Sequence, residues 1–132
     1  MKDSPIAIQT TSTLPFDAAV ARAREAIVKE GMGVLTEIDV QATLKKKLDV
    51  DRPPYLILGA CHPPSAHRSL SAVPEVGVLL PCNVTVSVED GKTVVRAMDP
   101  ASVMALVDSP ELAAVGAEVG AKLRRIVEAC RG

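Results

Sequence analysis

Two hydrophobic periods alternate along this chain, and they constrain its fold more than any other feature. Apolar residues recur at steps of three and four in residues 16–30 and 110–130, which is the repeat of a helix with one buried face. Other segments alternate apolar and polar residues, or are apolar almost throughout, as strands are. These strand-like segments are residues 5–11, 34–40, 55–61, 84–88 and 93–97. The chain therefore interleaves helices with strands along its whole length.

Shorter patterns complete the predicted order of elements. Residues 40–48 and 65–73 have helical spacing, and Asp90-Gly91 lies between two alternating runs, as in a hairpin turn. The predicted order is β-α-β-α-β-α-β-β-α. We predict an α+β fold in a single domain, residues 1–132, with one mixed or antiparallel sheet and helices mainly on one face.

Two runs, residues 55–61 and 76–80, are apolar at nearly every position. Strands that are apolar on both faces are usually covered on both faces. Helices on one side of the sheet leave the other side bare. We therefore expect either a homodimer that buries the second face or an internal pocket for a small-molecule ligand, and the sequence leaves both open.

Composition excludes several classes of protein. Of the 132 residues, 48% are apolar, which is too many for a disordered chain. Lysine and arginine number 15 against 16 acidic residues, and aromatic residues make up 2%, so neither phosphate binding nor base stacking is supported and we expect no nucleic-acid partner. No apolar run is long enough to span a membrane, so no membrane partner is expected.

Three cysteines, Cys61, Cys82 and Cys130, draw attention because an odd number cannot pair completely within one chain. The N-terminal segment does not resemble a signal peptide, so we expect reduced thiols in the cytoplasm. Cys130 lies on the apolar stripe of the last helix and is expected to fill the core. Cys61 ends an apolar strand, and Cys82 follows Pro81 at a break between two strand-like runs.

If the strand that ends at Cys61 neighbours the one that begins near Cys82, the two thiols approach each other. Histidine and asparagine side chains adjacent to them could add hydrogen-bonding groups. The candidate binding residues are Cys61, His62, Cys82, Asn83, His67 and Tyr55.

The same residues support alternatives of different kinds. In the plainest alternative, both thiols simply fill the core, as free cysteines commonly do. In a thiol-based enzyme or redox protein, Cys61 or Cys82 would react with help from His62, with Asn83 as the orienting group. Zinc could bind Cys61, His62, His67 and Cys82, but no Cys-x-x-Cys spacing supports it. The sequence thus assigns no catalytic residue, metal or cofactor, and whether the chain is an enzyme stays undecided.

Two motifs carry a family resemblance: Gly59-Ala60-Cys61, followed by His62-Pro63, and Leu79-Leu80-Pro81-Cys82-Asn83-Val84. With them, nearly the whole chain resembles the domain of unknown function 302 family of bacteria and archaea. The family more often has asparagine where this chain has His62. The resemblance implies an α+β fold and supplies no reaction. We therefore predict a small cytoplasmic domain that binds a small ligand or a partner near Cys61 and Cys82.

Overall fold

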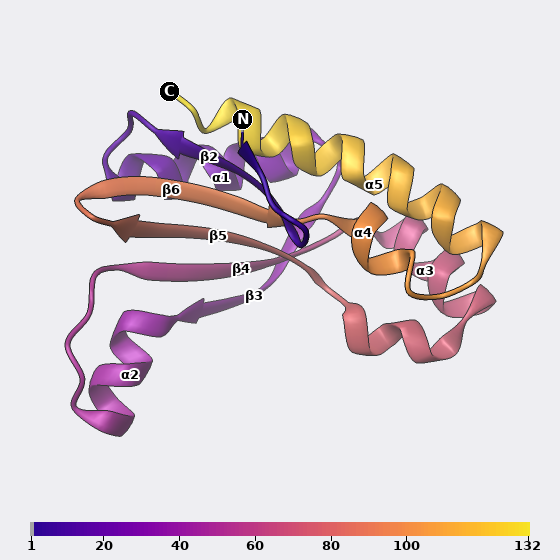
Figure 1. Cartoon of the computed structure of the whole chain (residues 1–132), viewed down its shortest axis with the longest axis horizontal. Coiled ribbons are helices and arrows are strands. Elements are labelled where there is room, and N and C mark those ends of the chain that lie inside the picture. Colours follow the sequence, from indigo (N-terminus) through magenta and orange to yellow (C-terminus); the bar gives the residue numbers. More distant parts are fainter. Residues whose placement is uncertain (1) are drawn as a thin grey trace.

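A single antiparallel sheet forms the centre of the computed structural model, which describes residues 2–132 (Figure 1). Its strands lie in the order β1-β2-β6-β5-β4-β3. Their bounds are β1 (Lys2–Asp3), β2 (Ala7–Ser12), β3 (Gly33–Asp39), β4 (Tyr55–Cys61), β5 (Cys82–Glu89) and β6 (Lys92–Met98). The predicted α+β class and order of elements are confirmed, with all strand pairs antiparallel.

Two long helices, α1 (Phe16–Lys29) and α5 (Pro110–Ala129), pack together and against the sheet. Helix α3 (Pro63–Ala72), a 3-10 helix η1 (Pro74–Leu79) and the short α4 (Pro100–Met104) gather at one end of the molecule (Figure 1). Helix α2 (Val40–Leu48) projects from the other end and has no buried residue. No described helix is both long and apolar enough to cross a lipid bilayer.

The strand register separates a buried face of the sheet from an open one. Directly paired residues Leu58, Val84, Ala97 and Ile8 form a row across four strands, and each is at most 1% exposed. This row faces the aliphatic side chains of α1 and α5, which together form the main core. The residues of the neighbouring row point the other way and are half-buried or exposed. They define the open face: Ile38, Ile57, Thr85, Arg96 and Gln9.

The predicted hairpin between β5 and β6 is confirmed. Its two turn residues, Asp90 and Gly91, have φ angles of 51° and 76°. Left-handed conformations at both central positions match the right-handed twist of the flanking strands, and Asp-Gly is one of the sequences that tolerates them. The turn thereby fixes the register of β5 and β6.

One local expectation is wrong. The apolar run 76–80, which is strand-like in sequence, lies largely in η1, where Val76 is 1% exposed and Val78 is 87% exposed. A five-residue apolar run does not by itself distinguish a strand from a helical turn. Helix α3 buries Ser65 and Ser69 and leaves Leu70 42% exposed.

Candidate functional site

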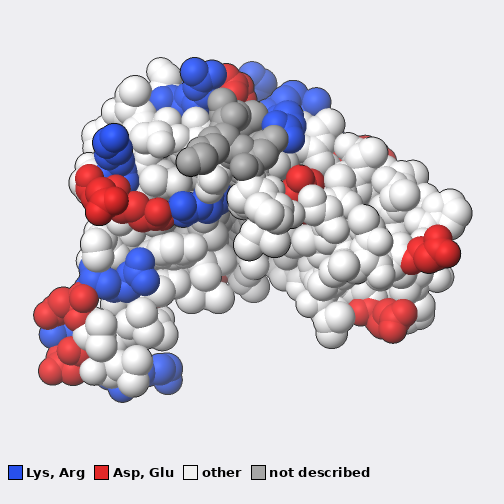
Figure 2. All heavy atoms as spheres, in the orientation of Figure 1, with Lys and Arg blue, Asp and Glu red and all other residues white. Residues whose placement is uncertain are grey.

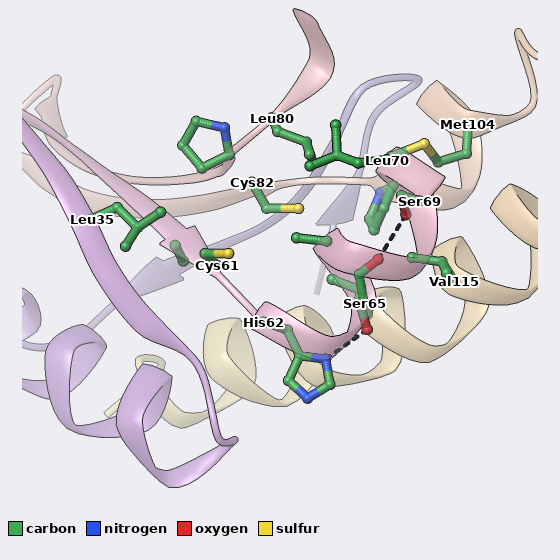
Figure 3. Close-up of a pocket in the computed structure, with 15 residues that line it drawn as sticks. Leu35, Cys61, His62, Ser65, Ser69, Leu70, Leu80, Cys82, Met104 and Val115 are labelled. Atoms are coloured by element: carbon green, nitrogen blue, oxygen red, sulfur yellow. Dashed lines mark hydrogen bonds between the residues drawn. The ribbon is translucent and has the colours of Figure 1, made fainter. Parts of the chain in front are cut away.

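A cavity of about 280 Å³ opens where the sheet meets α3, α4 and α5 (Figure 3). Its walls come from the end of β4, the start of β5 and the Leu80-Pro81 segment before β5, together with one face of each of the three helices. This volume lies just below the usual range for small-molecule binding sites, which is about 300–1,000 Å³, and therefore suits a small ligand. The cavity lies beside the two sequence motifs that contain Cys61 and Cys82.

The two thiols occupy the wall made by the sheet. Cys61 is the last residue of β4, and Cys82 is the first residue of β5, directly opposite Ala60. Cys61 is half-buried, while Cys82 is only 7% exposed. Burial raises the pKa of the Cys82 thiol to about 11, and the neighbouring Cys61 thiol adds to this effect. Cys82 is therefore a neutral thiol at physiological pH and a poor nucleophile.

The close approach of Pro81 to β4 helps to shape this wall. A Cβ atom on Gly59 would lie 2.8 Å from Cγ of Pro81 and 2.1 Å from Oγ1 of Thr36. Only glycine leaves room for both neighbours, so the Gly59 of the first motif lets the segment before Cys82 settle against β4.

A hydrogen-bonded histidine and serine contribute the main polar groups of the cavity. Nδ1 of His62, the residue before α3, lies 2.6 Å from Oγ of Ser65. Pro63 and Pro64 start the helix immediately after His62, which fits the preference of proline for the first helical positions. One turn further on, Oγ of Ser69 donates a hydrogen bond to the Ser65 carbonyl oxygen at 2.9 Å (Figure 3). The hydroxyl of Ser69 is thereby occupied within the helix.

The remaining walls are almost entirely hydrocarbon. Leu80, Met104, Val115 and Val119 line the interior, and no Asp, Glu, Lys or Arg is among the lining residues. Transferring an unpaired charge into such surroundings is costly. The cavity therefore suits a neutral, mainly apolar molecule.

The structure brings together three of the six candidate residues. Cys61, His62 and Cys82 line the cavity. Asn83 and Tyr55 lie beside a separate, shallower pocket on the other side of the sheet, with Thr85 and Arg96. His67 is exposed on α3 and does not line the cavity.

No three His, Cys, Asp or Glu side chains within residues 2–132 cluster in a way that could hold a metal ion. The four residues considered for zinc, Cys61, His62, His67 and Cys82, thus do not form a ligand set in this structure. The geometry gives zinc no support.

Sequence reasoning missed the polar residues contributed by the buried face of α3. Ser65 and Ser69 are 3% and 1% exposed, and their four-residue spacing places them on one helix face. That spacing is a signal that could identify them, whereas apolar periodicity does not include serine. Met104 escaped notice because nothing in the sequence joins α4 to this site.

The family comparison agrees with the fold. A family model described as domain of unknown function DUF302 matches residues 8–130. The chain belongs to the DUF302 family. The predicted resemblance is thereby confirmed, and it covers every residue of the cavity wall described above.

A solved DUF302 structure resembles this DUF302 chain over nearly its whole length. It is the crystal structure of an uncharacterized conserved protein from Bacillus stearothermophilus, which is 28% identical, with a TM-score of 0.88. The match covers 95% of this chain and 98% of that one. No curated protein matches the sequence.

Proposed function

We propose that this DUF302 domain binds a small, neutral and mainly apolar molecule in the cavity beside Cys61 and Cys82. The observation that carries the proposal is a cavity of about 280 Å³ whose mainly aliphatic walls hold one hydrogen bond between two side chains, that of His62 with Ser65. Such a combination of apolar surface and few polar groups is typical of small-molecule sites. The apolar wall supplies affinity, and the polar pair orients one oxygen or nitrogen of the ligand.

The lack of Asp, Glu, Lys and Arg in the lining narrows the ligand class. A carboxylate, phosphate or ammonium group would lose its hydration without gaining an ionic partner. An aliphatic alcohol, ketone or aldehyde places its chain against Leu80, Val115 and Val119 and keeps its polar end for His62. These neutral compounds are the expected ligands.

The test compares three probes of equal chain length: 1-octanol, octanoate and octylammonium. Octanol is expected to raise the melting temperature and to bind in calorimetry, whereas the two ions do neither. Ala66→Leu places three extra carbons in the cavity wall and is expected to abolish octanol binding. Ala72→Leu is the matched control, because Ala72 is exposed on the same helix and does not line the cavity.

Ser65→Ala tests the role of the polar pair. Removal of one neutral hydrogen bond is expected to weaken octanol binding by about 2- to 10-fold. Equal binding by the ion probes, or equal octanol binding by the Ala66→Leu and wild-type proteins, would contradict the proposal.

A thiol-dependent activity is the second candidate, and the accessibility of Cys61 favours it. Cys61 is half-buried on the cavity wall, while burial holds the Cys82 thiol protonated. We infer that any reaction with a bound electrophile takes place at Cys61. Loss of such a reaction in Cys61→Ala but not in Cys82→Ala is the expected result.

A further inference from the structure

The two ends of this molecule have opposite charge, and the open face of the sheet lies between them. Residues 40–52, which contain α2, have four Lys or Arg and two Asp. Residues 63–81 and 99–119, which contain α3, η1, α4 and the start of α5, have five Asp or Glu and one Arg. On the face seen in Figure 2, the second end shows red patches and no blue.

Local ion pairs leave an excess at each end. Lys45 binds Asp49 and Asp51 at 2.8 and 3.1 Å, so the adjacent Lys46 and Lys47 have no acidic partner within residues 2–132. At the other end, Arg68 lies 3.1 Å from Glu118 and 3.8 Å from Glu111.

Glu75 and Asp108 are exposed at this second end, and no ion pair in the described chain involves either of them. By formal count, residues 40–52 therefore carry a net charge of +2 (four minus two) and the second end carries -4 (one minus five), so the two ends are opposite in sign. Lys46 and Lys47 at the first end and Glu75 and Asp108 at the second contribute to these excesses.

The surface between the two ends is suited to burial. Exposed aliphatic side chains occur on α2, β3 and η1: Leu48, Ile38, Leu35 and Val78 are 66%, 47%, 67% and 87% exposed, and Leu35 also lines the cavity. A set of such residues on a monomer commonly marks an interaction surface. In the orientation of Figure 2 the molecule is hollowed between the projecting α2 segment and the opposite end.

The charged groups of the open face are already satisfied within the chain. Arg96 donates to both carboxylate oxygens of Glu89, and its Nε donates to Oε1 of Gln9 at 2.7 Å. Ser87 donates to the same carboxylate at 2.7 Å. Covering this face therefore strands no unpaired charge, which is the usual obstacle to burying a polar sheet surface.

Helix α2 gives an independent reason for a partner. It has nine residues and buries none of them, whereas an isolated helix of this length is marginal in water. Contact with another surface would stabilise it, and the acidic end carries the complementary charge.

We propose that the open face, with α2 and the α3–η1 end beside it, is the interface of a homodimer in which a second copy lies antiparallel to the first. A twofold axis in the plane of the interface, perpendicular to the line that joins the two ends, sets α2 of each copy against the acidic end of the other. The alternative axis, along that line, sets α2 against α2 and like charges together. Charge complementarity therefore selects the second copy and its orientation.

Charge exchange tests both the dimer and its orientation. One variant carries Lys46→Glu and Lys47→Glu, and the other carries Glu75→Lys and Asp108→Lys. Each variant alone places like charges across the interface, so its dimer Kd, from sedimentation velocity at low salt, is expected to rise more than about tenfold. An equimolar mixture restores opposite charges at both contacts and is expected to form a heterodimer. Lys29→Glu, a reversal on α1 in the helical layer, is the control and is expected to dimerise as the wild type does.

The aliphatic part of the interface has its own matched pair of variants. Ile38→Glu, on the open face, is expected to give a monomer, and Val28→Glu, 68% exposed on α1, is expected to leave the dimer intact. Far-UV circular dichroism confirms that each variant is folded. A wild-type monomer at micromolar concentration, undiminished dimerisation of the charge variants, or failure of the mixture to associate would each overturn the proposal.

Discussion

Gly59→Ala is expected to destabilise the protein because Gly59 is the contact point between β4 and the segment that leads to Cys82. The added Cβ would lie 2.1 Å from Oγ1 of Thr36 and 2.8 Å from Cγ of Pro81. Real Cβ atoms do not approach heavy atoms that closely, so at least one neighbour must move. The exposed Thr36 side chain can rotate, whereas Cγ of Pro81 can yield only by a change of ring pucker or a shift of the backbone that carries the ring.

The magnitude follows from comparison with Gly33→Ala in the adjacent strand. A Cβ on Gly33 meets no heavy atom within 4 Å. Both substitutions reduce the conformational entropy of the unfolded chain, which favours folding by about 0.4–1 kcal/mol in each case. That contribution cancels in the difference, which leaves the overpacking cost of about 1–3 kcal/mol at Gly59. Gly59→Ala should therefore unfold more easily than Gly33→Ala by this amount.

Urea unfolding followed by far-UV circular dichroism measures the difference, because the single tyrosine and the lack of tryptophan make fluorescence a weak probe. Adding Thr36→Ala to Gly59→Ala removes the nearer obstacle and reports how much of the cost belongs to Pro81. Octanol binding should also fall in Gly59→Ala, since Pro81 lines the cavity. Equal stability of the Gly59→Ala and Gly33→Ala proteins would refute the packing argument.

Two further predictions concern titratable groups. The guanidinium of Arg96 lowers the pKa of Glu89 from 4.5 to about 2, so the folded state favours the ionised carboxylate. This adds to the free energy of unfolding, by no more than about 1 kcal/mol because the pair is partly exposed. The contribution is complete above pH 4.5 and is lost as the pH falls towards 2. Urea unfolding between pH 4.5 and pH 2 should show a smaller loss of unfolding free energy for Glu89→Gln than for the wild type. If the free energies of the two proteins fell in parallel with pH, the ion pair of Glu89 with Arg96 would not be the cause. Because the pKa of Cys82 is about 11, iodoacetamide at about pH 8 should label Cys61 first and Cys82 only on unfolding; peptide mass spectrometry that found Cys82 labelled first in the native protein would contradict this.

Hydrophobic period predicted the long elements of the fold because those elements bury one complete face. The stripe of α5 is an example, with Leu112, Leu123 and Ile126 all fully buried. Asp90-Gly91 predicted the hairpin for a separate reason, since few residue pairs adopt two consecutive left-handed conformations. Residues 76–80 lacked both kinds of signal. Val76 is buried within a 3-10 helix, Leu79 and Leu80 pack against the same small cluster, and Val78 is exposed.

Whether a candidate residue on a strand lines the cavity depends on which side of the sheet its side chain occupies. Cys82 and Asn83 are consecutive residues of β5, so they point to opposite faces. The two-residue repeat of a strand therefore already places the Asn83 side chain on the opposite face from the Cys82 thiol. Proximity of Cys61 to Cys82 required the register of β4 and β5, which no local pattern in the sequence specifies. His67 was grouped with the site by sequence distance, but the helix turns it outward.

The scarcity of aromatic residues has a structural consequence that composition alone did not reveal. The only Phe and Tyr, Phe16 and Tyr55, both lie away from the cavity. Small side chains line much of the part formed by β4 and α3: Ala60, Ser65, Ala66 and Ser69. Close-packed interiors leave few voids larger than a water molecule, and these small side chains, with no aromatic ring in the lining, help to keep a cavity of about 280 Å³ open here. A leucine at position 66 would occupy part of that space, which is why the effect of Ala66→Leu on octanol binding separates a binding cavity from an incidental gap in packing.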